Sequence, residues 1–338
     1  NCVKRSMSKW RAEVQDGLRQ LTAPQWDALT HHTSPFLEHP FLASLEEAGC
    51  VGEGTGWQAL PLTLSDDSGE LVAGCPLYLK RHSMGEFVYD WAFADAAQRA
   101  GLPYYPKAII AAPFSPIPGQ KLLVRENLSA KDVEAARKQL LEAAIEVAQK
   151  AGCHSVHLLF CTAEEARAAQ KLGFFTRIAT QLHWKNDGYG CFDDFLQRFR
   201  SRRRKAIRRE RRQLESTGLS IEALAADEIP DSFCPAFFRF YTQTVSQFMW
   251  GRQYLNPRFF ELLWERFKHR IQVTVARQGD QPVAGTLNFE RHGRRHGRYW
   301  GTDIDIPNLH FELTAYTAIE DCIERRLDVF EAGAGDHP

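Results

Sequence analysis

The sequence predicts a mixed α/β protein built from two related domains. A chain of 338 residues is too long for one ordinary hydrophobic core. The segments Leu71-Val72-Ala73-Gly74 and Pro282-Val283-Ala284-Gly285 each begin the second strand of a predicted hairpin, and a strand, a helix and a short apolar strand follow each. Hairpins combined with βαβ units indicate mixed sheets with helices on both faces. We expect an N-terminal extension at residues 1–22, a first domain at 23–187 and a second domain at 188–338.

The elements of the first half follow from local signals. Two short helices are expected within residues 24–49, and Asp67-Ser68-Gly69 marks the turn of a hairpin. Ser129 caps the clearest helix, residues 129–151, in which apolar positions recur at helical spacing. The remaining expected elements are strands at EFVYDWAF (86–93), 107–112, 155–161 and FFTRIATQLHW (174–184), and a helix ending at Gly173.

The second half repeats this order. A basic helix is expected at residues 193–217, a strand at LSIEAL and two helices near 231–248 and 257–269. Three strands then lie within residues 271–301, with Gly279-Asp280 at the first turn. An amphipathic helix at 310–327 precedes a strand that begins at DVFEAG.

Composition and cysteine usage indicate a soluble cytoplasmic protein. Apolar residues make up 44% and charged residues 25% of the chain, and no apolar run reaches the roughly 18 to 20 residues that span a bilayer. The eight cysteines show neither a CxxC motif nor a metal-like spacing, so they are interpreted as reduced structural residues. The N-terminus lacks the apolar region of a secretory signal, and Met7 is interpreted as the natural start.

The charge is unevenly distributed. Residues 198–212 contain ten Lys or Arg and one acid, Glu210, although the formal net charge of the chain is zero. A helix with this charge repels itself unless anions lie against it. The functional interpretation is a site for the phosphates of tRNA or of a pyrophosphate-linked precursor; the alternative is a solvated helix that pairs with acids of the protein. The residues assigned to this site are Arg202, Arg203, Arg204, Lys205, Arg208, Arg209 and Arg212.

The order of elements resembles the acetyltransferase (GNAT) fold, present twice, and the local sequence resembles FemAB-like proteins of peptidoglycan biosynthesis or recognition. The matching segments are HPFLASLEEAGCVGEGTGWQ (39–58), VAGCPLYLKRHSMGEFVYDWAFADA (72–96), SRRRKAIRRERR (201–212), GRYWG (297–301), IPNLHFEL (306–313) and FEAGAGDH (330–337). The resemblance implies transfer of an acyl or aminoacyl group to an amine, in relatives from aminoacyl-tRNA to a lipid-linked cell-wall precursor. The chain ends within a motif that continues in this family, so we expect it to be a truncated version of a longer protein.

The resemblance departs from acyl-CoA-using proteins at one place. No Q/R-x-x-G-x-G/A loop lies between a strand and a helix, so the backbone N–H groups that would bind a pyrophosphate are missing. We therefore expect no tightly bound cofactor and aminoacyl-tRNA as the donor, with acetyl-CoA as the alternative. The expected partner is an anionic substrate at residues 198–212, without a transmembrane segment, and with peripheral membrane contact through a lipid-linked acceptor.

The loop GRYWGTDIDIPNLHFEL, between a strand and a helix, supplies the candidate catalytic residues. Amide formation needs a proton acceptor for the amine and donors for the developing oxyanion. The candidates for base work are Asp305, His310 and Glu312, while Arg298 and Tyr299 are expected to polarise a carbonyl or orient a phosphate. Trp300 is assigned to substrate binding. The structural alternative is that Glu312 satisfies the helix terminus and Trp300 lies in the core.

Two further groups complete the predicted site. Glu331 beside His337 is a candidate acid/base pair, and Tyr89 and Asp90 are expected to line a substrate pocket in the first half. His154 and His157 fall on opposite faces of a strand, so no metal site is predicted. We predict an acyltransferase that forms an amide by direct attack of the amine, linked to peptidoglycan precursors. The alternatives are an acyl-CoA-dependent N-acetyltransferase and a non-catalytic module that binds tRNA, other nucleic acid or a cell-wall precursor.

Overall fold

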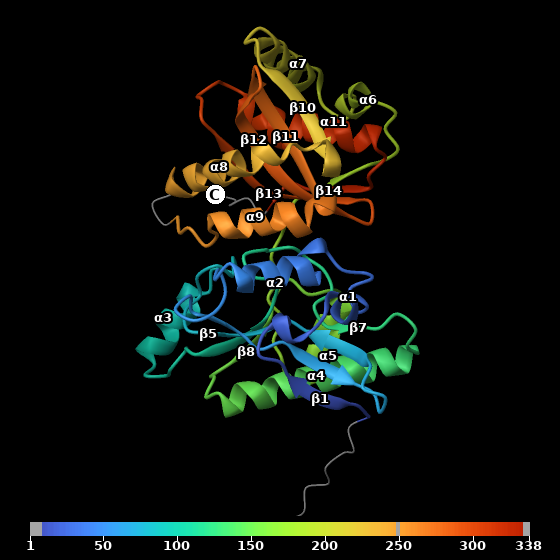
Figure 1. Cartoon of the computed structure of the whole chain (residues 1–338), viewed down its shortest axis with the longest axis vertical. Helices are drawn as coiled ribbons and strands as arrows, with labels where there is room; N and C mark the ends of the chain where they lie inside the picture. The colour runs from blue at the N-terminus through green and yellow to red at the C-terminus, as the bar shows by residue number, and fades with distance from the viewer. Residues whose placement is uncertain (1–8, 248–250, 334–338) are drawn as a thin grey trace, which may run out of the picture. The chain divides into compact units, whose positions relative to one another are not determined.

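The chain divides into two units, Asn1–Ala179 and Thr180–Pro338, in a computed structural model that describes residues 9–247 and 251–333. Each unit is a mixed α/β fold with both antiparallel and parallel strand pairs (Figure 1). Both units therefore have the mixed strand pairing that the sequence predicts.

Unit 1 contains two four-stranded sheets, in the orders β1-β3-β4-β7 and β2-β5-β6-β8. Its strands are β1 (Arg11–Val14), β2 (Trp57–Ala59), β3 (Leu62–Ser65), β4 (Leu71–Cys75), β5 (Leu77–Lys80), β6 (Lys107–Ile110), β7 (Leu123–Val124) and β8 (Val156–Leu158). Its helices are α1 (Ala23–Asp27), α2 (His39–Glu47), α3 (Trp91–Arg99), α4 (Ala130–Lys150) and α5 (Ala163–Gln170), with short 3-10 turns at Leu18–Gln20 and Pro35–Leu37.

The helix α4 shows how the sequence builds unit 1. Ser129 accepts a hydrogen bond from the Asp132 backbone N–H, as the cap prediction requires. The buried face of α4, which includes Leu140 and Leu141, packs on strand residues such as Leu64 and Ile110 in one core. The parallel pair β6–β8 lies in this core, with the registers Ala108↔Val156 and Ile110↔Leu158.

Unit 2 contains one six-stranded sheet in the order β10-β11-β12-β13-β14-β9. Its strands are β9 (Trp184–Lys185), β10 (Ser220–Ala225), β11 (Ile271–Gln278), β12 (Gln281–Arg291), β13 (Arg294–Thr302) and β14 (Val329–Glu331). Its helices are α6 (Phe192–Leu196), α7 (Ser201–Glu215), α8 (Cys234–Gln247), α9 (Pro257–Arg266), α10 (Leu309–Phe311) and α11 (Thr317–Glu324), with 3-10 turns at Ala226–Glu228, Asp231–Phe233 and Lys268–Arg270 and a π-turn, η6, at Glu312–Tyr316.

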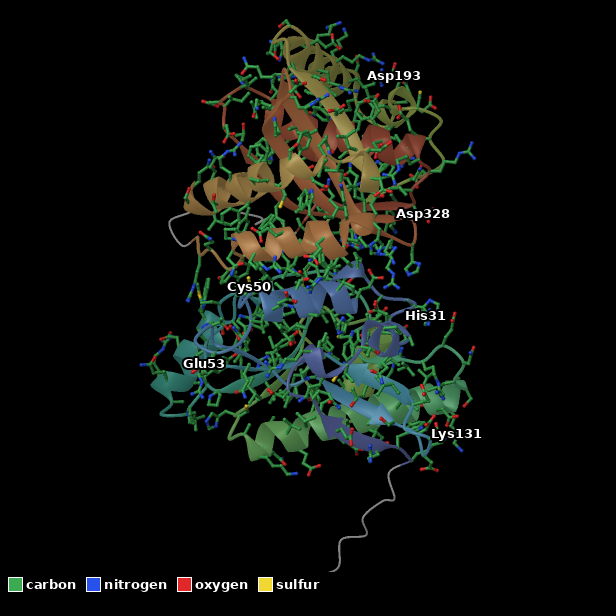
Figure 2. All side chains as sticks on the ribbon, viewed as in Figure 1. His31, Cys50, Glu53, Lys131, Asp193 and Asp328 are labelled. Carbon is green, nitrogen blue, oxygen red and sulfur yellow. The ribbon has the colours of Figure 1, made fainter. Side chains whose placement is uncertain are left out.

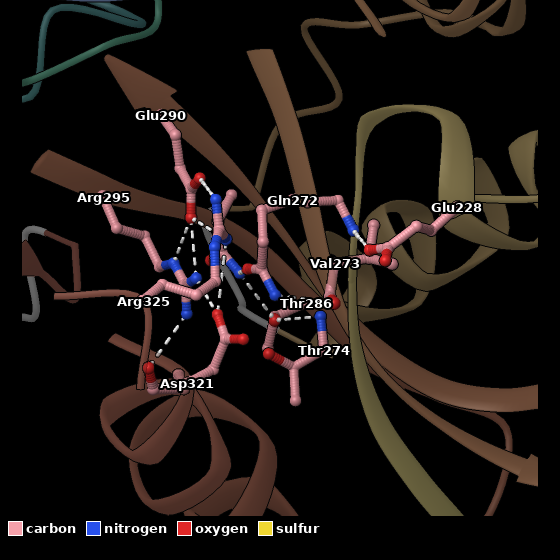
Figure 3. A network of polar contacts seen from close by, with 12 residues as sticks. Glu228, Gln272, Val273, Thr274, Thr286, Glu290, Arg295, Asp321 and Arg325 are labelled. Carbon is pink, nitrogen blue, oxygen red and sulfur yellow. Dashed lines mark hydrogen bonds and ion pairs between the residues drawn. The ribbon is translucent and has the colours of Figure 1, made fainter. Parts of the chain in front are cut away.

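A buried arginine joins the sheet of unit 2 to α11 (Figure 3). Arg295 on β13 is fully buried and donates to Glu290 Oε1 at 2.6 and 2.8 Å, to the Ala318 carbonyl at 2.9 Å and to Asp321. Arg325 donates to the same Glu290 carboxylate. Each charge in this cluster has an opposite partner, which a buried ion requires.

The structure corrects four local predictions. Residues 86–93 are not a strand: Phe87 and Tyr89 adopt left-handed φ values of 59° and 47°, and α3 begins at Trp91. Of residues 174–184 only Trp184 is in a strand, β9, which pairs with β14 in unit 2. The predicted basic helix is two helices, α6 and α7, because Arg200 is extended. The predicted helix 310–327 contains the π-turn and ends at Glu324.

Candidate functional site

The strands β13 and β14 pair in parallel over a short register. Among the described residues, it covers Arg294–His296 and Val329–Glu331, whereas β13 pairs with β12 along nearly its whole length. Arg298 is an extra residue in the β12–β13 register, between the pairs Asn288↔Gly297 and Leu287↔Tyr299, and so forms a bulge. A Cβ on Gly297 would lie 3.1 Å from the Ala332 carbonyl oxygen, so glycine lets the residue that follows β14 approach β13 closely.

The helix α8 contacts β13 beyond this point. A Cβ on Gly301 would lie 2.1 Å from the Phe240 carbonyl oxygen, so only glycine fits at this position. The Thr244 hydroxyl donates to the Trp300 carbonyl oxygen. Close approach to β14 and α8 therefore explains both glycines of the GRYWG segment.

The structure places Tyr299 and Trp300 on opposite faces of the sheet. The Tyr299 ring packs on Tyr241 of α8 and Phe260 of α9, with centroids 5.2 and 6.1 Å apart. The Arg298 guanidinium lies 5.4 Å from the Tyr299 ring centroid. Trp300 instead packs edge-on against His310 of α10, with centroids 4.8 Å apart. Successive strand residues alternate between faces, so the sheet separates Tyr299 from the pair formed by Trp300 and His310.

The loop between β13 and α10 carries exposed carboxylates. Asp303 accepts hydrogen bonds from Arg239 and Gln243 of α8, and these bonds lower its pKa. Asp305 is exposed and has no hydrogen bond or ion pair within the part of the chain that the structure describes. His310 is exposed on one side, and burial on the other lowers its pKa. The loop therefore presents two carboxylates between β13 and α10.

Glu312 is buried and connects the π-turn to α7. It is 3% exposed, and its Oε1 accepts from Arg211 Nε at 3.0 Å and from the Thr317 hydroxyl at 2.8 Å. Its Oε2 has no hydrogen-bond partner among the described residues. Burial raises the pKa of Glu312 despite the opposing charge of Arg211. A π-turn often marks a functional position, and here Glu312 is its first residue. Arg211 was not among the predicted site residues.

Several cations of α7 are paired within unit 2. Arg203 donates to the Tyr316 hydroxyl at 2.9 Å and to Glu210 at 3.3 Å. Arg208 donates to Asp193 of α6 at 2.9 Å, and Figure 2 labels Asp193. Arg204 donates to the Phe199 carbonyl oxygen. These three predicted phosphate ligands thus have partners in the protein, as the solvated-helix interpretation expected.

Four other cations of α7 form an unpaired row, which we call the cation stripe. Its members are Arg202, Lys205, Arg209 and Arg212. All four are exposed, and none has a hydrogen bond or ion pair with the described residues. Their spacing of i, i+3, i+7 and i+10 places them on one face, opposite the buried Ile207 and Leu214. Part of the basic segment is therefore structural, and part is left without a counter-charge.

Glu331 belongs to a buried ionic cluster. Its Oε2 lies 3.0 Å from His296 Nδ1 and its Oε1 accepts from Arg294 at 2.5 Å. Burial would raise the pKa of Glu331, but hydrogen bonds and charge from His296 and Arg294 outweigh burial and hold it at about 2. His337, the partner expected from the sequence, lies outside the described residues. The strand pattern did select Glu331, but only the parallel register identifies His296 as its partner.

In unit 1, Asp90 is part of a second buried cluster. Lys107 is fully buried, and its Nζ donates to Asp90 at 2.5 Å, Glu86 at 2.7 Å and Ser83 at 2.9 Å. Burial would raise the pKa of Asp90, but hydrogen bonds that include those from Lys107 and Tyr104 hold it at about 2. The neighbouring Tyr89 is 50% exposed. The two predicted residues are therefore adjacent in sequence but differ in environment.

The described part of the chain contains neither clustered metal ligands nor a membrane-spanning helix. Within residues 9–247 and 251–333, no group of three or more His, Cys, Asp or Glu side chains is placed to hold a metal ion. No helix in the described ranges is both long and apolar enough to cross a bilayer.

Solved structures share this fold. FemX matches with a TM-score of 0.54 and 12% identity over 94% of this chain and 88% of FemX. A conserved protein of unknown function from Bacteroides thetaiotaomicron VPI-5482 has a TM-score of 0.51 and 10% identity, over 95% and 89% of the two chains. A tandem GNAT protein from the clavulanic acid biosynthesis pathway has a TM-score of 0.48 and 11% identity, over 97% and 91%. The fold shared with FemX confirms the predicted mixed α/β class.

The sequence itself matches one protein family. No curated protein matches the chain significantly. The profile of the FemAB-like family, described as peptidoglycan biosynthesis/recognition, matches residues 17–337. The chain therefore belongs to the FemAB-like family, which confirms the predicted class of acyl- or aminoacyl-transferases linked to peptidoglycan metabolism.

Proposed function

We propose that unit 2 transfers an aminoacyl group from aminoacyl-tRNA to an amine of a cell-wall precursor. The observation that supports this donor is the cation stripe on α7, four exposed cations without a partner among the described residues. Ten residues of helix separate Arg202 from Arg212, which corresponds to about 15 Å along the axis. A row of this length suits several successive phosphates of a nucleic-acid backbone.

The loop after β13 disfavours coenzyme A as the donor. A pyrophosphate bound at this place would approach Asp303 and Asp305, and like charges at close range raise the free energy of the complex. Asp303 also engages Arg239, the nearest cation that could offset this repulsion. The proposal therefore assigns the donor phosphates to α7 and leaves this loop to contact other parts of the substrates.

The reaction needs the groups that surround β13. The amine nitrogen attacks the ester carbonyl carbon, the C–N bond forms, the ester C–O bond breaks, and the proton lost by the amine passes to the ribose oxygen that leaves. Arg298 and Tyr299, which lie together at the bulge, are proposed to orient the reacting carbonyl. His310, Asp305 and Trp300 are proposed to contact parts of the acceptor away from its reacting amine, because the sheet separates Trp300 and His310 from Tyr299, and Glu312 is proposed to hold α7 through Arg211.

Binding of aminoacyl-tRNA at increasing salt tests the donor. The stripe variant Lys205→Glu/Arg209→Glu should bind aminoacyl-tRNA at least about 10-fold more weakly at low salt. In a plot of the logarithm of the binding constant against the logarithm of the salt concentration, its slope should be shallower by roughly 0.7 to 0.9 for each phosphate that is no longer neutralised. The matched control is Lys131→Glu/Lys185→Glu, an equal charge change at exposed lysines of other elements; Lys131 is labelled in Figure 2. Equal weakening by both double variants, or displacement of tRNA by micromolar acetyl-CoA, would contradict the proposal.

A further inference from the structure

Phe311, at the end of α10, carries an aromatic ring that the core does not use. Its side chain is 52% exposed, and within the described residues it is the only Phe, Tyr or Trp of unit 2 that is exposed by half or more. Leu309 of the same short helix is buried and packs with Leu214 of α7 in one core cluster. A single exposed ring needs no explanation by itself, so its position decides whether it has a role.

Two contacts with α7 fix the position of this ring. Asn308, which precedes α10, donates from Nδ2 to Gln213 Oε1 at 3.3 Å. Glu312, which follows α10, accepts from Arg211 Nε at 3.0 Å. Gln213 and Arg211 are the sequence neighbours of Arg212, the last member of the cation stripe. The exposed ring lies between the two contacts in sequence, and therefore beside the C-terminal end of the stripe.

Two further rings hold Phe311 in place. The ring centroids of His310 and Phe311 are 5.4 Å apart, and the two planes meet at 68°. The His310 ring in turn packs on Trp300 of β13, with centroids 4.8 Å apart. The three rings form a ladder that starts on the sheet and ends at an exposed ring. A side chain that is already supported in this way loses less conformational entropy when a ligand binds to it.

The charges around the ring select the kind of ligand. The cation stripe needs an anion with several charges along one line, such as a chain of phosphates. The exposed carboxylate of Asp305, in the loop before α10, repels phosphates but has little effect on an uncharged flat group. A strand of nucleic acid with an unpaired base presents both features, phosphates on one side and a free π-face on the other. The bases of a duplex are already stacked on one another and cannot cover the ring.

We propose that Phe311 stacks on an unpaired base of the donor RNA, while the cation stripe binds phosphates of the same molecule. The assignment rests on the proposed function, because aminoacyl-tRNA carries its amino acid on an unpaired end. Stacking accepts any base, so Phe311 contributes affinity for single-stranded RNA and no preference for sequence. Phe311 thereby contacts the donor, whereas its neighbour His310 contacts the acceptor.

Binding of two uncharged RNA hairpins, measured by fluorescence anisotropy, tests the assignment. Both hairpins have the same stem, and one also has a short unpaired 3′ end. The wild type should bind the hairpin with the unpaired end at least about 5-fold more tightly. Phe311→Ala should weaken binding of this hairpin by about 5- to 150-fold, the range for one stacked base, and leave binding of the blunt hairpin unchanged. Its dependence on salt should equal that of the wild type, because no phosphate contact is lost.

Two control variants and a spectroscopic signal sharpen the test. Phe311→Trp keeps a π-face and should retain the preference for the unpaired end. Phe175→Ala removes a fully exposed ring of unit 1 and should bind both hairpins as the wild type does. The fluorescence of 2-aminopurine in the unpaired end should be quenched by the wild type and by Phe311→Trp, and not by Phe311→Ala.

The results separate this assignment from the proposed function. Equal binding of both hairpins by the wild type, with both weakened in Lys205→Glu/Arg209→Glu, would overturn the role of Phe311 and leave the donor site standing. A Phe311→Ala variant that binds both hairpins equally weakly would also overturn stacking. If Phe311→Ala does not fold, Phe311→Leu replaces it, and an undiminished preference for the unpaired end in that variant would overturn the assignment. A wild type that binds neither hairpin would overturn both proposals.

Discussion

The two units place different side chains at the same point of the same strand arrangement. In unit 1, β6 and β8 pair in parallel and end at Ile110↔Leu158; in unit 2, β13 and β14 pair in parallel and end at His296↔Glu331. The unit 1 pair is apolar and packs in the core, whereas the unit 2 pair is ionic. The same topology therefore serves packing in one unit and, in our account, chemistry in the other.

The segments that follow these two parallel pairs also differ between the units. In unit 1 the loop after β6 is buried from Ala111 to Ile117, and the buried Lys121 ammonium donates to the carbonyl oxygens of Ile117, Gly119 and Phe160. This loop fills the space where the parallel strands part. In unit 2 the corresponding place holds the bulge at Arg298 and the glycine contacts with Ala332 and α8. The segment after the parallel pair is thus packed in unit 1, whereas in unit 2 it is shaped by a bulge and close glycine contacts.

The largest effect is expected from breaking the packed loop of unit 1. Lys121→Met removes the buried ammonium donor of the Ile117 and Gly119 carbonyl oxygens, while the Phe160 carbonyl oxygen keeps the Gly119 N–H, so we expect a loss of about 4 kcal/mol. Hydrogen exchange followed by mass spectrometry should show faster exchange in peptides of unit 1 and unchanged exchange in unit 2. Lys131→Met, at an exposed lysine of α4, is the control. Equal exchange in both variants would show that Lys121 does not hold the loop.

The ionic pair should give unit 2 an acid-sensitive stability of its own. The pKa of Glu331 is about 2 in the folded state and 4.5 without interactions, so the unfolded state binds more protons between these values. Its contribution, about 3 kcal/mol, is complete above pH 4.5 and is lost as the pH falls toward 2. Glu331→Gln should flatten the unfolding free energy of unit 2 over this range. A variant with the wild-type slope would contradict the lowered pKa.

A smaller effect is expected at the contact of α8 with β13. Gly301→Ala forces backbone atoms apart at Phe240, and overpacking of this kind typically costs about 2 kcal/mol. The transfer rate should fall as well, because α8 would move away from the Tyr299 ring. The control is Gly190→Ala, because a Cβ on Gly190 would meet only the flexible Asp194 carboxylate. Gly218 is not suitable as a control, since its positive φ makes any substitution strained. Equal melting temperatures for the two variants would argue against the close approach.

Local signals predicted the parts of the fold that depend on neighbours in sequence. The cap at Ser129 and the turn at Gly279-Asp280 placed α4 and the β11–β12 hairpin correctly. The apolar alternation of EFVYDWAF is also typical of a strand, but Glu86 and Asp90 both bind Lys107, about twenty residues later in the chain. A buried ion that recruits distant carboxylates overrides local propensity.

The sequence predicted the basic segment of the candidate site, but its prediction of the other site residues was incomplete. Counting charges found α7, but which cations remain unpaired depends on contacts such as Arg211 with Glu312, 101 residues apart. The choice of Glu331 needed only its place in an apolar strand, whereas the pairing with His296 depends on the parallel register. The split of Tyr299 and Trp300 between two faces follows from strand alternation, yet the prediction places both residues in one site because they share one loop segment.

Exchanging the unit 2 pair for its unit 1 counterpart tests the central claim most directly. The double variant His296→Ile/Glu331→Leu gives β13 and β14 the last pair of β6 and β8. An apolar pair should leave the melting temperature nearly unchanged, because both buried members of the pair are replaced together and Arg294, which loses Glu331, is 43% exposed. We predict that the variant binds aminoacyl-tRNA with wild-type affinity and transfers its group at least about 10-fold more slowly, because the pair lies next to Arg298 and Tyr299, which are proposed to orient the reacting carbonyl. A stable variant with wild-type transfer would contradict the claim that unit 2 uses this point of the fold for chemistry.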